Sequence, residues 1–218
     1  MQPQLFDING NVLYAILADL SSKRPFFYSE MDFQFCLGWA LQEEYNKEVI
    51  FEKRFDLPAG QAGNTQRQYI DIILRDGEHF IPIELKYKTK KAVVREKDGR
   101  DYTLLDQSAQ DLGCYHFVRD IARIEGMKRE PGFIRGFTII LTNDPYYYEP
   151  GGKRNPSYED FLLYESTKTR LLHGSLVWKE REDRYPAITL GGAYPISSGS
   201  WRVYSESPQF RYLLFEIA

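Results

Sequence analysis

The sequence predicts an α/β domain in which a mixed central sheet is flanked by helices and followed by a β-rich C-terminal extension. Two observations support this class. A helical pattern from Ser29 precedes three β-rich segments, and a second helical pattern then leads to an apolar strand ending at Thr142. At 218 residues, 43 % of them hydrophobic, the chain is long enough for a substantial core. We therefore expect one domain over 1–218, with a core at about 29–142 and the extension at about 143–218.

Capping residues and apolar spacing predict the two N-terminal helices. Asp7 or Asn9 can cap a helix near 11–21. Ser29 is expected to cap the second helix, with Glu30 in the first turn, where the helix dipole favours an acid. Apolar residues of this second helix recur at helical spacing: Phe33, Cys36, Leu37, Ala40, Leu41 and Tyr45.

A strand at Val49–Phe55 and a β-hairpin over 66–87 follow. Asp76-Gly77 lies between the two β-rich runs of the hairpin. This pair is a strong signal for a two-residue turn, because a type I′ turn requires φ > 0 at both central residues. Such a turn pairs Arg75 with Glu78.

This register gathers three charged side chains on one face of the hairpin. Asp71 falls opposite Pro82, and alternation along the strand places Pro82, Glu84 and Lys86 on the same face. Asp71 is then a diagonal neighbour of Glu84, about 7–8 Å away. The opposite face is predicted to be core and carries Ile70, Ile72, Leu74, Ile81, Ile83 and Leu85.

The rest of the chain is predicted to contain one long helix and several strands. The helix is expected from Thr103 to about Gly126, after a turn at Lys97-Asp98-Gly99-Arg100. Phe133–Thr142 is apolar throughout, which suits a central strand buried on both faces. The last third is expected to hold a short helix at Tyr158–Tyr164 and extended segments at Ser175–Lys179, Ala187–Leu190, Trp201–Ser205 and Phe210–Ile217.

Asp71 and the tripeptide Glu84-Leu85-Lys86, in the order helix–three strands–helix–strand, resemble the active site of the PD-(D/E)xK nuclease superfamily. Ile70 stands where the family's nominal proline precedes the aspartate. The resemblance implies a restriction-endonuclease-like fold and a Mg²⁺- or Mn²⁺-dependent nuclease, with DNA as the expected substrate. It also implies that Asp71, Glu84 and the backbone carbonyl of Leu85 hold the metal.

The chemistry of these residues agrees with that role. Asp71 and Glu84 supply carboxylate oxygens, which Mg²⁺ prefers, and a bound ion can activate water and stabilise charge at a phosphate. Lys86 is expected to position or activate the water and to offset developing negative charge. The alternative is that all three charges lie on an ordinary solvated face of an antiparallel sheet.

Two further parts of the site are suggested by the family resemblance. An acid on the first core helix often completes the metal site, so Glu30 or Gln34 is a candidate, with Glu52 as a weaker one. For Glu30 the alternative is a simple interaction with the helix dipole.

The long helix could contribute a glutamine. RecB-like members of the superfamily carry a Gln-x-x-x-Tyr motif on this helix, but Gln110 and Tyr115 are one residue too far apart to match. Gln107 is therefore the residue that we expect to line the site. The alternative is a plain polar face of the helix.

A net charge of −3 means that any nucleic-acid surface must be local. Lys88, Lys90 and Lys91 could contact a phosphate backbone, and the alternative is a solvated loop. Tyr146–Tyr148 with Lys153 and Arg154 could stack on single-stranded bases, and the alternative is packing on their own domain.

Other classes of site find no support in the sequence. Cys36 and Cys114 are expected to be reduced thiols, and the three histidines have no zinc-binding spacing. No secretion signal or membrane span is recognised, so we expect a cytoplasmic protein without membrane contact. No familiar recognition domain is present either, which leaves a homodimer or a partner subunit as a source of specificity.

The leading hypothesis is therefore a metal-dependent nuclease that hydrolyses phosphodiester bonds. The first alternative is a nuclease fold without catalysis that acts as a nucleic-acid-binding or protein-interaction module. The second is a structural protein in which the charges of the hairpin are coincidental.

Overall fold

The computed structural model describes residues 4–59, 64–96, 98–151 and 154–218. Its helices are α1 (Gly10–Lys23), α2 (Glu30–Tyr45) and α3 (Gln110–Gly126), with short 3₁₀ helices at Leu5–Asp7, Met127–Arg129, Pro145–Tyr147 and Pro156–Phe161. Its strands are β1 (Glu48–Ala59), β2 (Asn64–Asp76), β3 (His79–Lys88), β4 (Ala92–Arg95), β5 (Asp101–Leu104), β6 (Gly136–Thr142), β7 (Arg170–Leu176), β8 (Ile188–Ile196), β9 (Arg202–Glu206) and β10 (Gln209–Ile217).

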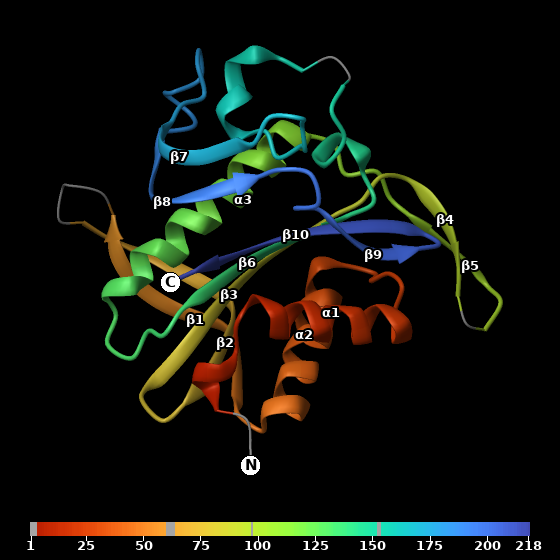
Figure 1. Ribbon diagram of the computed structural model, residues 1–218, viewed down its shortest axis with the longest axis horizontal. Coiled ribbons are helices and arrows are strands. Elements are labelled where there is room, and N and C mark those ends of the chain that lie inside the picture. The colour runs from red at the N-terminus through yellow and green to blue at the C-terminus, as the bar shows by residue number, and fades with distance from the viewer. Residues whose placement is uncertain (1–3, 60–63, 97, 152–153) are drawn as a thin grey trace.

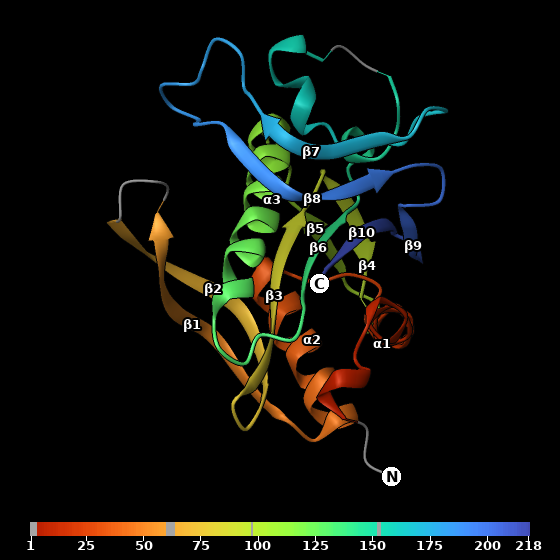
Figure 2. The same ribbon diagram turned by 60° about the vertical axis from the view of Figure 1, so that its left-hand side comes forward.

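A six-stranded mixed sheet forms the centre of the molecule, in the order β1-β2-β3-β6-β10-β9. Strands β3 and β6 run parallel, and the other neighbours are antiparallel. Helices α1 and α2 cover one face, whereas α3 and the β7–β8 pair cover the other (Figures 1 and 2). The predicted α/β class with a mixed sheet flanked by helices is therefore confirmed.

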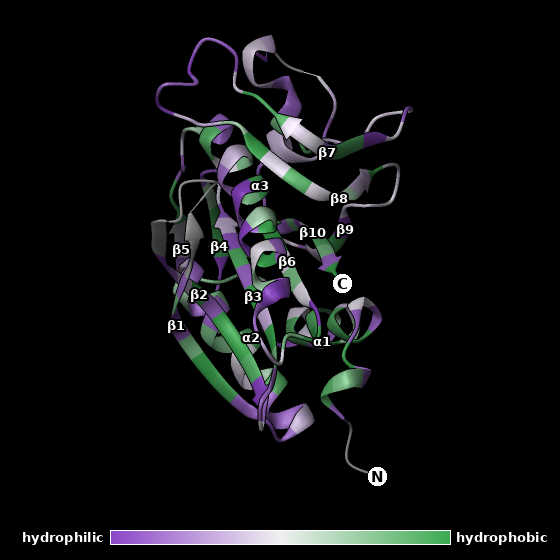
Figure 3. Ribbon diagram, turned by 90° about the vertical axis from the view of Figure 1, so that its left-hand side faces the viewer, coloured by the Kyte–Doolittle hydropathy of each residue, from purple (hydrophilic) through white to green (hydrophobic). Residues whose placement is uncertain are grey.

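The sheet separates two hydrophobic clusters, and β6 contributes to both. Ile139 and Leu141 pack on the α1/α2 side, while Ile140 packs on the α3 side. All seven residues of β6 are buried, which confirms the prediction of a central strand buried on both faces. In contrast, most residues of β8 alternate between buried and exposed, and Figure 3 shows hydrophobic (green) bands alternating with paler ones along this strand.

The predicted helix starts are confirmed by their caps. The side chain of Asn9 accepts hydrogen bonds from the backbone N–H groups of Asn11 and Val12, and Ser29 accepts one from Asp32. Helix α2 ends where Asn46 adopts a left-handed conformation, with φ of 50°. These local signals position α2 against β2 and β3, where the charged residues of the hairpin lie.

The hairpin forms, but its predicted register is wrong by two residues. Asp76 pairs with His79 and Arg75 pairs with Phe80, so the turn residues are Gly77 and Glu78. Gly77 has φ of 59°, as the first central residue of a type II′ turn requires. This turn needs a positive φ only from glycine, whereas the predicted turn would also need one from Asp76. A shift of two residues preserves which side chains share a face.

The predicted long helix is shorter than expected. Residues 103 and 104 belong to β5, which pairs with β4 in a small hairpin, and α3 begins only at Gln110. Val94 and Leu104 are buried on the α2 side of the sheet, so tertiary packing holds this segment extended. The predicted turn lies between β4 and β5, where Gly99 has φ of 86°, although Lys97 falls outside the described residues.

The C-terminal region is rich in strands, as predicted, but part of it completes the central sheet. β10 pairs antiparallel with β6, and β9 pairs with β10. The helix expected at Tyr158–Tyr164 is a 3₁₀ helix over Pro156–Phe161. β7 ends at Leu176, so most of the strand expected at Ser175–Lys179 is not extended in a sheet.

Candidate functional site

The candidate site lies at the centre of the sheet, on β2 and β3. β3 is bordered by β2 and by β6, and its residues Glu84 and Lys86 lie beside Thr138 and Ile140 of β6. On the other side, the last ladder pair between β2 and β3 is Ile72 with Ile83. Asp71 and Glu84 come next on their two strands, so the structure places Asp71 beside Glu84 rather than opposite Pro82. The two predicted carboxylates thus lie closer in register than we expected.

Asp71 lies at an irregularity in the sheet. The ladder between β1 and β2 pairs Phe51 with Ile72 and Lys53 with Ile70, but it skips the intervening Glu52 and Asp71. The backbone of Glu52 has φ of 50°. The prediction that Ile70 and Ile72 share a face is consequently wrong: Ile70 packs on the α3 side and Ile72 on the α2 side.

Gln34 of α2 holds this irregularity in place. Its side chain is only 5 % exposed, and its Nε2 donates to the backbone O of Asp71 at 2.5 Å and to Glu52 Oε1 at 3.0 Å. The carboxylate of Asp71 turns to β3, where Oδ2 accepts a hydrogen bond from the backbone N–H of Leu85 at 2.6 Å. Gln34 therefore orients Asp71 through its backbone and leaves the carboxylate at β3.

Burial raises the pKa of Asp71 to about 6. The positive charge of Lys86 and the hydrogen bond from Leu85 oppose this shift, whereas the carboxylates of Asp120 and Glu30 add to it. A protonated carboxyl at this position is consequently common at mildly acidic pH.

Glu84 is deeply buried, with 1 % of its surface exposed. Burial raises its pKa well above the usual range, and the nearby carboxylates of Asp120 and Asp71 act in the same direction. Its Oε1 lies 2.9 Å from Arg123 Nη2, an ion-pair distance. Within the described part of the chain, neither oxygen of Glu84 has a partner in hydrogen-bond geometry. Glu84 thus keeps unused capacity to bind a cation.

Lys86 is held by α3 and by its own strand. Its Nζ lies 2.9 Å from Asp120 Oδ2 and donates to the backbone O of Leu85 at 3.0 Å. Burial acts to lower the pKa of Lys86, but the carboxylates of Asp120 and Glu30 outweigh it and raise the pKa. The ammonium is therefore charged at neutral pH, which favours charge stabilisation over proton abstraction as its role.

Asp120 and Arg123 of α3 are the site residues that sequence reasoning missed. Asp120 is 1 % exposed, and its Oδ1 lies 3.1 Å from Arg123 Nη1. A signal was present, since Asp120 interrupts the apolar face formed by residues such as Phe117, Ile121 and Ile124. A charged residue on the buried face of an amphipathic helix requires a buried partner.

Three buried carboxylates thus share two cations in a connected network. Arg123 links Glu84 to Asp120, Asp120 in turn holds Lys86, and Asp71 lies next to them on β2. Burial raises the pKa of the two β-strand carboxyls, and their neighbouring carboxylates add to this shift. The alternative of a solvated polar face is therefore wrong.

The protein should lose stability as the pH rises, because folding favours the protonated form of Asp71. The pKa of about 6 lies above the ordinary 3.8, so this contribution is full below pH 3.8 and is lost as the pH rises through 6. We expect Asp71 to contribute about 2–3 kcal/mol to the fall in the free energy of unfolding between pH 4 and 7. In Asp71→Asn this part should be absent, whereas the part due to the raised pKa of Glu84 should remain, as measured by urea unfolding.

The control for this measurement is Asp101→Asn, because Asp101 is an exposed acid on β5 paired with Arg95. It should retain the wild-type pH profile. If Asp71→Asn showed the same profile as the wild type, Asp71 would not be the titrating group.

Glu30 and Glu52 are placed differently around the network. Glu30 lies in the first turn of α2, and its Oε2 accepts a hydrogen bond from the backbone N–H of Tyr87 on β3 at 2.8 Å. It contributes to the raised pKa of Lys86, so it acts electrostatically on the site. Glu52 contacts Gln34 rather than Asp71 directly.

The expected glutamine does not come from the long helix. Gln107 lies before α3, is exposed, and its backbone N–H donates to Thr89 O at 2.8 Å, so its predicted helical placement is wrong. Gln110 donates to Asp144 at 3.1 Å, and the Tyr115 hydroxyl donates to Pro186 O at 2.9 Å. Neither residue takes the part implied by the family motif.

Further basic side chains extend from the network along β3 and α3. Lys88 follows Lys86 on β3, and His116 and Arg119 precede Asp120 on α3. Burial lowers the pKa of His116, and the charges of Arg119, Lys86 and Lys88 lower it further, so these groups surround the imidazole.

The two other predicted lysines lie beyond β3 and are exposed. Lys90 is fixed through its backbone by Asn143, whose side chain bonds both the N–H and the O of Lys90 at 2.7 and 3.0 Å. Lys91 follows it, also exposed, just before β4. Of the three predicted lysines, Lys88 is thus the one on the strand that carries Glu84.

The tyrosine cluster packs on its own domain. Tyr147 and Tyr148 are buried, and the guanidinium of Arg154 lies 4.7 Å from the ring centre of Tyr146. Arg154 also donates to the backbone O of Tyr146 and of Glu149. These side chains do not form an open stacking surface, and Lys153 falls outside the described residues.

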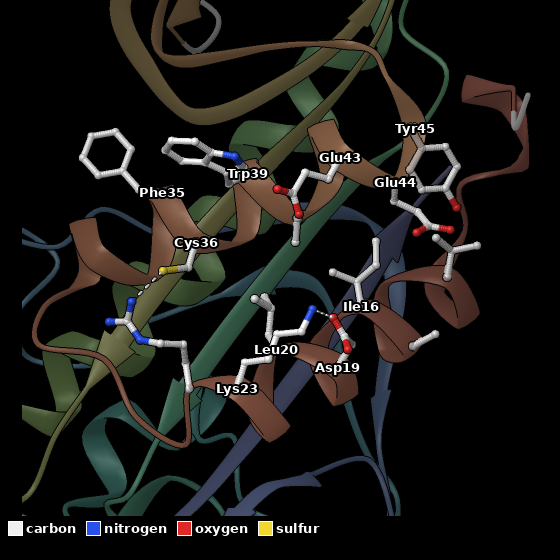
Figure 4. Close-up of a pocket in the computed structure, with 14 residues that line it drawn as sticks. Ile16, Asp19, Leu20, Lys23, Phe35, Cys36, Trp39, Glu43, Glu44 and Tyr45 are labelled. Carbon is white, nitrogen blue, oxygen red and sulfur yellow. Dashed lines mark hydrogen bonds and ion pairs between the residues drawn. The ribbon is translucent and has the colours of Figure 1, made fainter. Parts of the chain in front are cut away.

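A groove of about 890 Å³ lies between α1 and α2, on the opposite side of the sheet from α3. Figure 4 shows Phe35 and Trp39 on α2 above Leu20 and Lys23 of α1. Trp39 is 67 % exposed. The acidic residues that line the groove lie on the helix surfaces, and Asp19 is paired with Lys23. Among its described lining residues, the groove therefore holds no buried cluster of reactive groups comparable to the network on β3.

Comparison with protein-family models, with curated proteins and with solved structures gives no match to this chain. Among the described residues no helix has the length and apolar character needed to cross a membrane. In the same residues, no three or more His, Cys, Asp or Glu side chains come together in a group that could hold a metal ion. The fold and site define an α/β protein with a mixed sheet and a buried charge network at its centre.

Proposed function

We propose that this protein is a metal-dependent nuclease of the PD-(D/E)xK type with a restriction-endonuclease-like core. The observation that carries the proposal is the placement of Asp71 and Glu84 side by side on adjacent central strands, with Lys86 two residues beyond Glu84. The order α2-β1-β2-β3-α3-β6 also agrees with the family core, with the β4–β5 hairpin as an insertion.

The donors of the site are compatible with Mg²⁺ or Mn²⁺. Burial raises the pKa of both carboxyls, and Glu84 Oε2 is buried without a hydrogen-bond partner among the described residues. Asp71, Glu84 and the carbonyl of Leu85 would hold the ion, a set with only two acidic side chains. When bound, the ion would supply an activated water and charge stabilisation at the phosphate.

The residues of the chain have separable parts in this proposal. Lys86, charged and fixed by Asp120, would orient the attacking water and offset negative charge that develops on the phosphate. Gln34 would hold the backbone of Asp71 in place. Glu30 would support the charge of Lys86 rather than contact the metal.

DNA is the proposed substrate, held by cations next to the site. Lys88 follows Lys86 on β3 and could contact a phosphate despite the net charge of −3, and the neutral imidazole of His116 on α3 could donate a hydrogen bond there. The exposed Lys90 and Lys91 lie further along the same segment and would extend this surface. A partner subunit or homodimer remains the proposed source of sequence or structure specificity.

Asp71→Asn is expected to weaken Mn²⁺ binding by at least about tenfold, since even the loss of an outer-sphere partner costs that much. Isothermal titration calorimetry on the purified protein measures this directly. Asp101→Asn, which changes an exposed acid on β5, serves as the control. Unchanged Mn²⁺ affinity in Asp71→Asn would remove Asp71 from the metal site.

A second candidate function is a nuclease fold that binds nucleic acid or protein without cleaving. It is favoured by the ion pairs that already engage Glu84 and Lys86. A cleavage assay on single-stranded, double-stranded and branched DNA with Mg²⁺ or Mn²⁺ separates the two functions. Binding without cleavage on every substrate would support the second.

A further inference from the structure

The guanidinium of Arg123 lies against the buried acids of the candidate site. Its guanidinium reaches acceptors on three elements: Glu84 Oε1 on β3 at 2.9 Å, Asp120 Oδ1 on α3 at 3.1 Å, and Gln68 Oε1 on β2 at 3.1 Å. It also donates to the backbone O of Tyr69. Its side chain is 18 % exposed, so the positive charge is directed inward at the two buried acids.

The position of Arg123 is explained by Glu84. A carboxylate with 1 % exposure would be strongly disfavoured without a positive partner, and Arg123 lies within ion-pair distance. Lys86, the other cation, is engaged by Asp120 and by Leu85 O. Arg123 is therefore the cation in direct contact with Glu84.

A divalent ion on Glu84 would meet the guanidinium at short range. Two cations cannot share one carboxylate oxygen without repulsion, and the repulsion is strong in a site this buried. Asp120 offers Arg123 another partner, because Nη1 already lies 3.1 Å from its Oδ1. Arg123 can thus leave Glu84 and keep a salt bridge on its own helix.

We propose that Arg123 sets the metal affinity of this site by competing with the divalent ion for Glu84. The inference rests on the proposed function, because it assumes that Glu84 is a metal ligand. Metal binding then requires Arg123 to release Glu84 and to keep its salt bridge with Asp120. Until the ion binds, the guanidinium of Arg123 takes its place and keeps the buried acids paired.

The test is calorimetric titration of Mn²⁺ into the metal-free wild type, Arg123→Gln and Arg119→Gln. Arg119 is exposed and lies one turn before Arg123 on α3, so its variant removes an equal charge without touching Glu84. We expect Arg123→Gln to bind Mn²⁺ at least about tenfold more tightly than the wild type, and Arg119→Gln to match the wild type. In thermal melts, Arg123→Gln should melt lower without metal and should gain more from saturating Mn²⁺.

Equal or weaker Mn²⁺ binding by folded Arg123→Gln would overturn the inference, and so would an equal gain in Arg119→Gln. If Arg123→Gln does not fold without metal, Arg123→Lys replaces it. Lysine keeps the charge but cannot reach all of these acceptors at once. We therefore expect Arg123→Lys to bind Mn²⁺ more tightly than the wild type. Any other result would overturn the inference.

The same titrations separate this inference from the proposed function. Wild-type binding that is lost in Asp71→Asn but unchanged in the Arg123 variants would overturn only the role of Arg123. Absence of Mn²⁺ binding in the folded wild type and in both folded Arg123 variants would overturn the metal site itself, and the role of Arg123 with it.

Discussion

Replacement of Lys86 by alanine is expected to abolish metal-dependent cleavage and to leave the protein folded. The ammonium of Lys86 is held 2.9 Å from Asp120 and is charged at neutral pH, so it can stabilise negative charge that develops at a phosphate. Loss of one such preorganised group lowers turnover by about 10²–10³-fold in enzymes generally. The fold should survive, because Asp120 keeps its second partner, Arg123.

The measurement is turnover on single-stranded, double-stranded and branched DNA with Mg²⁺ or Mn²⁺, together with a thermal melt of each variant. Lys168→Ala is the matched control, since Lys168 is exposed, lies before β7 and is outside both the network and the proposed DNA-binding surface. It should retain cleavage close to the wild-type rate. A Lys86→Ala protein that cleaves at the wild-type rate would remove Lys86 from the mechanism.

Asp120→Ala is expected to produce the largest loss of stability, about 3 kcal/mol in the free energy of unfolding. Asp120 is 1 % exposed and is shared by Lys86 and Arg123. Its removal leaves Lys86 without its carboxylate partner and takes from Arg123 one of the two carboxylates that it contacts. Breaking a buried pair from one side is costly because the remaining charge cannot be solvated.

Urea unfolding of the metal-free protein measures this loss. Asp111→Ala is the control on the same helix, because Asp111 is in the first turn of α3 and should cost less than about 1 kcal/mol through the helix dipole. A loss as small as that of the control would show that the network stabilises the protein no more than an exposed salt bridge does. The connected, buried description of the site would then be wrong.

Local signals predicted most of the elements around the site. The caps of α1 and α2, the apolar strand β6 and the alternation along the hairpin depend on neighbouring residues, so they could be identified without the fold. The shared face of Asp71, Glu84 and Lys86 was also predictable. The error in register shifted the hairpin by two residues, an even number, and therefore did not change the face.

The errors arose where distant contacts override local preference. Residues 103 and 104 resemble the start of a helix, but pairing with β4 and burial against the α2 side make them a strand. Gln107 was placed on the helix for the same reason. Ile70 changed face because the ladder is irregular at Glu52, where Gln34 from α2 bonds both strands.

By itself, the sequence determined the α/β class, the two carboxylates and lysine of the hairpin, and the central position of β6. These features follow from period-two and helical spacing and from capping and turn residues. Only the tertiary structure decided that α3 supplies Asp120 and Arg123, that Glu84 is buried, and that Lys86 is a fixed cation. The physical reason is that burial and charge pairing depend on which helix packs on which face, and this contact joins residues far apart in the chain.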